Sequence, residues 1–110
     1  MNTWTMHNAL RGLLLIACAG VGSTVQAHSP FCDCKQINPT QIRCSGGFSD
    51  GGDAAGVTLD VIGYDENILL HGQLGSDSSL TFDKPAGEFY VLFDAGPGAV
   101  VEVDHLDIGQ

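Results

Sequence analysis

Residues 89–104 read FYVLFDAGPGAVVEVD, and this stretch decides the fold class. Its first five residues are apolar on both alternating faces, which predicts a central strand covered on both sides. Residues 94–98 supply the Asp, Gly and Pro that reverse a chain in a tight turn. Residues 99–104 return to a strand pattern. The stretch therefore predicts a strand, a turn and a second strand.

Similar patterns recur toward the amino terminus. Short strand signals cover residues 57–62, 68–71 and 80–82, and turns rich in Gly, Asp and Ser separate them. No segment keeps a helical apolar stripe over about ten residues. We therefore predict an all-β fold, an antiparallel β-sandwich of about seven short strands with immunoglobulin-like or transthyretin-like architecture. It would form a single domain over residues 28–110.

Residues 31–48 predict a hairpin that carries three cysteines at the start of this domain. Its turn is expected at residues 38–40, Asn-Pro-Thr, because Asn-Pro starts turns and proline cannot donate to a strand ladder. If Cys34 faces Cys44, Ile37 faces Gln41 across a three-residue loop.

This hairpin allows two disulfide registers. Cys34 faces Cys44 in the first, and a shift of two residues brings Cys32 opposite Cys44 in the second. Side chains alternate with period two, so both registers keep the cysteines on one face and the pattern does not choose between them. Cys32 and Cys34 point the same way from nearby positions and seldom bond to each other, so Cys44 is one partner. Cys34–Cys44 is our working pair, Cys32–Cys44 stays open, and one thiol is left over.

Residues 1–27 have the features of a cleaved secretory signal peptide. Arg11 precedes an apolar run over residues 13–19, and residues 25–27, Val-Gln-Ala, fit a cleavage site after Ala27. The apolar run is too short for a membrane anchor. A bacterial lipoprotein box ending at Cys18, which would be lipidated, is the alternative.

Cleavage after Ala27 has two consequences for the mature chain. It discards Cys18 and makes His28 the amino terminus. It also sends the chain to the periplasm or the exterior, where disulfides persist. After cleavage we expect no direct membrane insertion.

The charge of residues 28–110 restricts the partners of the domain. These residues contain three Lys and Arg against thirteen Asp and Glu, a formal net charge of −10. Nucleic acid and anionic lipid are poor partners for such a surface, because like charges repel. A cation or a cationic partner fits better.

Several motifs resemble a known family. They are Gly46-Gly47-Phe48-Ser49-Asp50-Gly51, Ala55-Gly56-Val57, Tyr64-Asp65 and residues 87–98, GEFYVLFDAGPG. Together they resemble small bacterial periplasmic β-sandwich proteins, transthyretin-like or carboxypeptidase-regulatory-like, that are related to accessory components of nickel and cobalt uptake. Relatives often carry a histidine after the Gly-Pro-Gly turn, where this chain has Ala99. The resemblance therefore implies a metal-related role without supplying this ligand.

The candidate metal ligands lie mostly near the predicted amino terminus. A terminal His28 would offer an amine and an imidazole nitrogen to Cu(II) or Ni(II), which prefer nitrogen-rich tetragonal sites. Cys32 and Cys34, together with His71 and His105, could complete a shell, and the thiolates would favour Cu(I). The alternatives are a frayed terminal histidine, surface histidines on strands and cysteines that only form a disulfide.

The sequence contains no serine elbow, metalloprotease helix or phosphate-binding glycine loop, so we do not expect an enzyme. We predict a periplasmic protein that binds one transition-metal ion, nickel, cobalt or copper, or that assists a periplasmic or membrane metal-transport protein. The alternative is a protein–protein interaction module whose cysteines are purely structural.

Overall fold

The computed structural model describes residues 28–110. The predicted leader and Cys18 lie outside the described residues. The described part contains seven strands and one short 3-10 helix: β1 (Pro30–Asn38), β2 (Gln41–Phe48), β3 (Thr58–Gly63), β4 (Ile68–Gln73), β5 (Ser79–Asp83), β6 (Phe89–Asp94), β7 (Val100–Asp104) and η1 (His105–Asp107). The predicted strands all form, with bounds that differ mainly at their ends.

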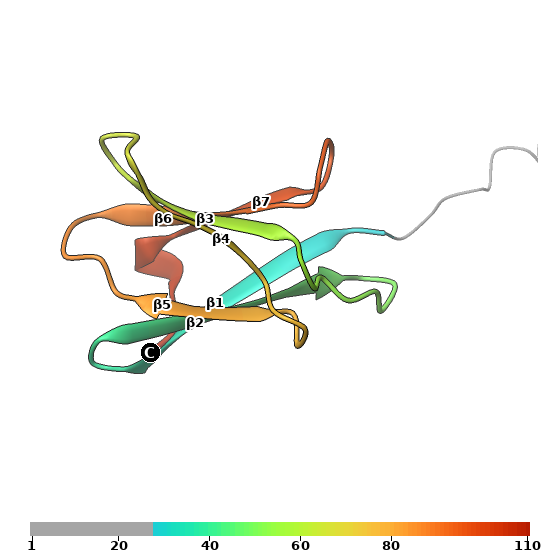
Figure 1. The fold of residues 1–110 in the computed structure, drawn as a ribbon, viewed down its shortest axis with the longest axis horizontal. Coiled ribbons are helices and arrows are strands. Elements are labelled where there is room, and N and C mark those ends of the chain that lie inside the picture. The colour runs from blue at the N-terminus through green and yellow to red at the C-terminus, as the bar shows by residue number, and fades with distance from the viewer. Residues whose placement is uncertain (1–27) are drawn as a thin grey trace, which may run out of the picture.

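The strands form two antiparallel sheets that stack as two layers (Figure 1). One sheet has the order β1-β2-β5 and the other has the order β4-β3-β6-β7. The predicted all-β sandwich is confirmed. The hairpins β1–β2, β3–β4 and β6–β7 each lie within one sheet, whereas β5 pairs with β2 and β6 with β3, so the chain passes between the layers after β2, after β4 and after β5.

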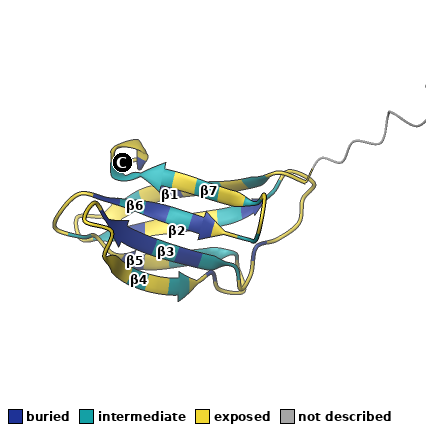
Figure 2. Cartoon of the chain, turned by 90° about the horizontal axis from the view of Figure 1, so that it is seen from above, coloured by how far each residue is buried: buried dark blue, intermediate teal, exposed yellow. Residues whose placement is uncertain are grey.

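The core lies between the layers and follows the alternation of the strands. Leu59 and Val61 on β3 and Val91 and Phe93 on β6 are buried, and they face the buried Ile42 of β2. Figure 2 shows this buried stripe along β3 and β6. Burial of these side chains between the sheets is the main stabilising contribution to such a fold.

The prediction that β6 is covered on both sides is wrong for one face. Phe89, Val91 and Phe93 are buried, whereas Tyr90 and Leu92 are only half-buried. A sandwich has two layers, so the outer face of each sheet meets solvent even at a central strand.

The cysteine hairpin forms with the Cys34–Cys44 register, but its loop differs from the prediction. Asn38 pairs with Gln41, and the register shifts between Gln36 and Asn38, so that Ile37 is an extra, bulged residue. The turn therefore contains only two residues. Asn38 shortens the loop because its side-chain oxygen accepts a hydrogen bond from the backbone N–H of Thr40 at 2.9 Å.

Most acidic turn residues hold their own turns. Six Asp side chains accept a hydrogen bond from the backbone N–H two residues later: Asp50, Asp53, Asp65, Asp77, Asp94 and Asp104. These contacts are the expected role of aspartate in turns. Much of the acidic excess is thus used to fix the loops between strands.

The chain end closes one side of the sandwich. After β7, η1 leads to the buried Ile108, and Gly109 then lies beside β1. The N–H of Gly109 donates to the carbonyl oxygen of Cys34 at 3.1 Å, and the N–H of Gln36 donates to the carbonyl oxygen of Gly109 at 2.8 Å. Residues 105–110, here called the C-terminal strap, therefore link the two sheets.

The sheets approach each other closely at Gly46. A Cβ atom at this position would overlap the Phe93 ring, with Cδ2 of Phe93 at 3.0 Å and Cδ1 of Leu74 at 3.1 Å. Phe93 is fully buried and cannot move aside without disturbing the core. Glycine at this point allows the layers to pack.

We expect Gly46→Ala to lower the free energy of unfolding by about 1–3 kcal/mol, because the added methyl group overpacks the core. Urea unfolding followed by circular dichroism would measure the change. Gly87→Ala is the matched control, since a Cβ at Gly87 would meet nothing within 4 Å. Equal effects of the two substitutions would contradict the close packing at Gly46.

Candidate metal centre

Three cysteine sulfurs converge on the inner face of the β1–β2 hairpin. Cys32 and Cys34 lie two residues apart on β1, so their side chains point to the same face. Cys44 on β2 lies opposite Cys34. The three Sγ atoms lie within 4.8 Å of one another. Within residues 28–110, these cysteines form the one cluster of at least three side chains that could hold a metal ion together.

Two of these sulfurs form a disulfide. Cys34 and Cys44 are bonded, with their Cα atoms 4.0 Å apart, which resolves the two registers that the sequence left open. Both residues are buried, at 3% and 0% exposure, so they belong to the core. Cys32 is a free, half-buried cysteine that packs against that core.

The thiol of Cys32 lies beside the disulfide and not in line with it. Its Sγ is 4.0 Å from Sγ of Cys34 and within 4.8 Å of Sγ of Cys44. In-line attack on Cys34 would place the attacking sulfur about 6 Å from Cys44, given an S–S bond of about 2 Å. The side-on position therefore does not favour thiol–disulfide exchange within the cluster.

The protonation of Cys32 points the same way. Burial, followed by the nearby charge of Asp33, raises the pKa of the Cys32 thiol to about 11. Exchange requires the thiolate, so a thiol that stays protonated near neutral pH is a poor nucleophile. While the Cys34–Cys44 disulfide is intact, the Cys32 thiol therefore does not readily attack it.

His28 has its own partners. Its Nδ1 lies 2.7 Å from Oδ2 of Asp50, and its ring stacks on Phe48 with the ring centroids 4.4 Å apart. A carboxylate only accepts hydrogen bonds, so Nδ1 carries the proton in this contact. A chelate with the α-amine of the same residue would use Nδ1, and it would first have to displace Asp50.

His71 lies on β4, on the outer face of the four-stranded sheet. Its side chain is 71% exposed, and Nδ1 lies 2.6 Å from Oδ1 of Asp60 on β3. Leu70 packs against the core, so the neighbouring His71 points to solvent, as the alternative of a surface histidine on a strand holds.

His105 lies in a third place, at the start of η1. Its Nδ1 is 3.1 Å from the carbonyl oxygen of Phe89, which can only accept, so this nitrogen also carries a proton. Asp104 accepts hydrogen bonds from the Tyr64 hydroxyl and from the N–H of Leu106. The hydrogen bond from Tyr64 is the largest cause of the lowered pKa of Asp104, and it raises the pKa of Tyr64 to about 12.

The predicted ligands therefore separate into two kinds. Cys32 and Cys34 come together, whereas none of the three histidines joins their cluster within residues 28–110. Sequence reasoning gave Cys44 only a disulfide role and missed it as a third sulfur of the cluster. The period of two that places Cys32 and Cys34 on one face, together with the pairing of Cys44, contained that signal.

Comparisons with protein-family models, curated proteins and solved structures give no match to this chain. Among residues 28–110, no helix has the length and apolar character needed to cross a membrane. The disulfide is compatible with an oxidising, extracytoplasmic compartment.

We expect alkylation of Cys32 in the native protein to be slow near pH 8 and to accelerate until the pH reaches about 11, because only the thiolate reacts. Iodoacetamide labelling at a series of pH values, followed by peptide mass spectrometry, would give the rate. Labelling in urea provides the control, since unfolding restores the ordinary pKa near 8.5. A native rate that levels off near pH 8.5 would contradict the burial of this thiol.

We expect Asp104→Asn to reduce the loss of stability in acid. Because the pKa of Asp104 is lowered in the folded state, its carboxylate stabilises the fold at pH values above the unfolded-state pKa of about 3.9. This stabilisation is lost as the pH falls through the folded-state pKa. An amide oxygen can still accept from Leu106, but it does not titrate. Thermal unfolding at about pH 7 and about pH 2.5 should therefore show a smaller difference for the variant than for the wild type. An equal difference would argue against the prediction.

Proposed function

We propose that the protein binds one soft transition-metal ion through Cys32, Cys34 and Cys44 in their reduced form, and that it does so without catalysing a reaction. Of the metals expected from the sequence, three thiolates favour Cu(I) over nickel and cobalt. The observation that carries this proposal is the convergence of three sulfurs within 4.8 Å on one face of a hairpin.

The spacing of the sulfurs supports trigonal coordination. The Cys32 and Cys34 sulfurs are 4.0 Å apart. The centre of an equilateral triangle with this edge lies about 2.3 Å from each corner, which is the usual length of a metal–thiolate bond. Only Sγ of Cys44 would need to move away from Cys34 to complete the triangle, and it is freed to do so when the disulfide is reduced.

Binding in this way depends on the redox state. A small-molecule dithiol gives two hydrogen atoms to the Cys34–Cys44 disulfide and becomes a disulfide itself, leaving three protein thiols. Each thiol then loses its proton as the metal binds. In the disulfide form, a single thiol remains within residues 28–110, so the affinity for the metal should be far lower.

The surroundings of the cluster suit a soft ion. Cys34 and Cys44 lie in the core, and half-buried Cys32 offers a route for the metal from the surface. The apolar neighbours would exclude water and harder oxygen ligands. The net charge of −10 on residues 28–110 would raise the local concentration of cations.

The cellular role follows from the predicted leader and from the resemblance described above. We place the protein in the periplasm or outside the cell, where it would hold copper, or pass a metal ion to a periplasmic or membrane transport protein. The Cys34–Cys44 disulfide is compatible with an oxidising compartment, so only molecules whose disulfide has been reduced would hold the metal there.

We expect the reduced protein to bind one Cu(I) per chain in an anaerobic titration against a competing chelator. The disulfide form and the Cys32→Ser and Cys44→Ser variants should bind at least about tenfold more weakly. His71→Ala is the control and should bind like the wild type, because His71 lies outside the cluster. X-ray absorption of the copper complex should show sulfur neighbours at about 2.3 Å.

Circular dichroism of each sample would establish that the sandwich persists after reduction. Binding by the folded, reduced protein that is no tighter than binding by the disulfide form would overturn the proposal. The cysteines would then be structural, as the alternative from the sequence holds.

A further inference from the structure

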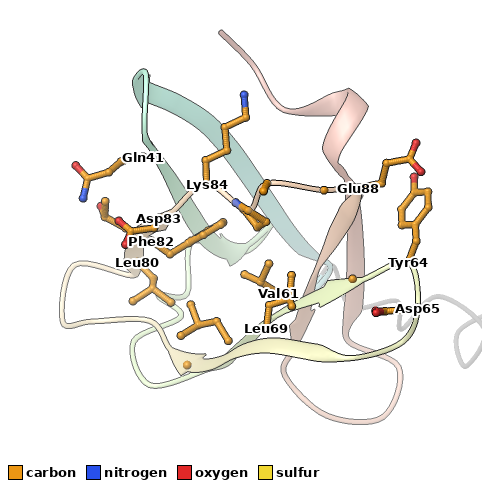
Figure 3. A pocket seen from close by; sticks show the side chains of 17 residues that line it. Gln41, Val61, Tyr64, Asp65, Leu69, Leu80, Phe82, Asp83, Lys84 and Glu88 are labelled. Carbon is orange, nitrogen blue, oxygen red and sulfur yellow. The ribbon is translucent and has the colours of Figure 1, made fainter.

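The sandwich is open on the side opposite the C-terminal strap. A groove of about 960 Å³ lies between β4 of one sheet and β5 of the other. The chain crosses between the sheets near both ends of this groove, after β4 and again after β5. Figure 3 shows side chains from both strands bordering the same space.

The walls of the groove are apolar. Leu69 and Leu70 contribute from β4, Leu80 and Phe82 from β5. The register shifts between Val61 and Ile62, so Leu69 is an extra residue opposite the β3 ladder. This bulge brings two consecutive leucines to the groove, although strict alternation would turn one of them outward. Leu69 remains 52% exposed at the mouth of this groove.

Backbone groups on both sides of the groove lack a strand partner. Within residues 28–110, β4 pairs only with β3, and β5 pairs only with β2. The C=O of Ser79 at the start of β5 already accepts a hydrogen bond from the N–H of Gly75 at 2.8 Å, and the other outward N–H and C=O groups of these two edges are free to pair with an added strand. The opposite side of the sandwich differs, because the C-terminal strap already hydrogen-bonds to the edge of β1.

The charges around the groove are mostly negative. Asp83 lies on one side, and Asp65 and Glu88 lie on the other (Figure 3). Lys84 is the one basic residue of the lining. Its ammonium points away from the leucines and donates to Oε1 of Gln36 at 3.3 Å. The groove thus presents apolar walls with carboxylates at its margins.

We propose that this groove binds an extended segment of a partner protein, in which apolar side chains alternate with polar ones and Lys or Arg residues flank them. The added strand would hydrogen-bond to the free backbone groups of β4 or β5. Its apolar side chains would cover the four apolar side chains that line the groove, Leu69, Leu70, Leu80 and Phe82. The flanking cations would meet Asp65, Asp83 and Glu88. This function is independent of metal binding by the cysteines.

The two other occupants fit less well. A second copy of this chain would bring together two domains that each carry a net charge of −10, and this repulsion opposes association. A small apolar molecule could occupy the volume, but it would leave the free backbone groups of β4 and β5 unused.

The direct test uses two labelled peptides, Lys-Val-Thr-Val-Lys-Val-Thr-Val-Lys and the same peptide with Glu in place of each Lys. Fluorescence anisotropy should show that the cationic peptide binds with a dissociation constant below about 1 mM and at least about tenfold tighter than the anionic one. Hydrogen exchange should show new protection of backbone amides in β4 or β5. The preference for the cationic peptide should fall as salt is raised.

Variants locate the site. Leu69→Asp should abolish binding of the cationic peptide, whereas Leu106→Asp should not, because Leu106 is 79% exposed and lies outside the groove. The double variant Asp83→Lys with Glu88→Lys should bind the anionic peptide better than the cationic one. Thermal unfolding checks that each variant is folded.

Three results would overturn the proposal. The first is binding weaker than about 1 mM for both peptides. The second is binding that survives Leu69→Asp in the folded protein. The third is a stable dimer in sedimentation experiments that Leu69→Asp dissolves, which would make a second copy the occupant.

Discussion

The packing of two β-sheets against each other is the constraint on which the other features depend. Phe93 and its neighbours on the four-stranded sheet must meet Ile42 and the disulfide on the three-stranded sheet, and Gly46 leaves the space for this contact. The alternation that turns Ile42 and Cys44 inward also turns Cys32 and Cys34 inward. The sulfur cluster is therefore a direct result of the hairpin register that builds the core.

The sequence predicted the fold well because period-two patterns and turn residues are local signals. Residues 89–104 indicate two strands and the turn between them, and Asp94 holds that turn as its residue type suggests. The two bulges, at Ile37 and Leu69, were not predictable from alternation, because each depends on the pairing of a whole strand. Exposure of the outer face of β6 likewise depends on the number of layers, which a single strand does not encode.

The candidate site was only partly predictable, for a related reason. Cys32 and Cys34 are near in sequence and share a face, so their proximity follows from the strand itself. The positions of His28, His71 and His105 depend on contacts between distant segments, and each histidine lies against an oxygen acceptor of its own. Residue types that suit a metal therefore do not show that their side chains meet.

The C-terminal strap has a consequence for self-association. In strand order, β1 is the edge of its sheet, and edges are where sandwich proteins aggregate. Gly109 occupies the backbone of β1 beside Cys34, so this edge is capped by the chain's own end. Another molecule could pair with β1 beside Cys34 only after the C-terminal strap had detached from this edge. The capped edge thus shields the sulfur-bearing strand from intermolecular sheet growth at that point.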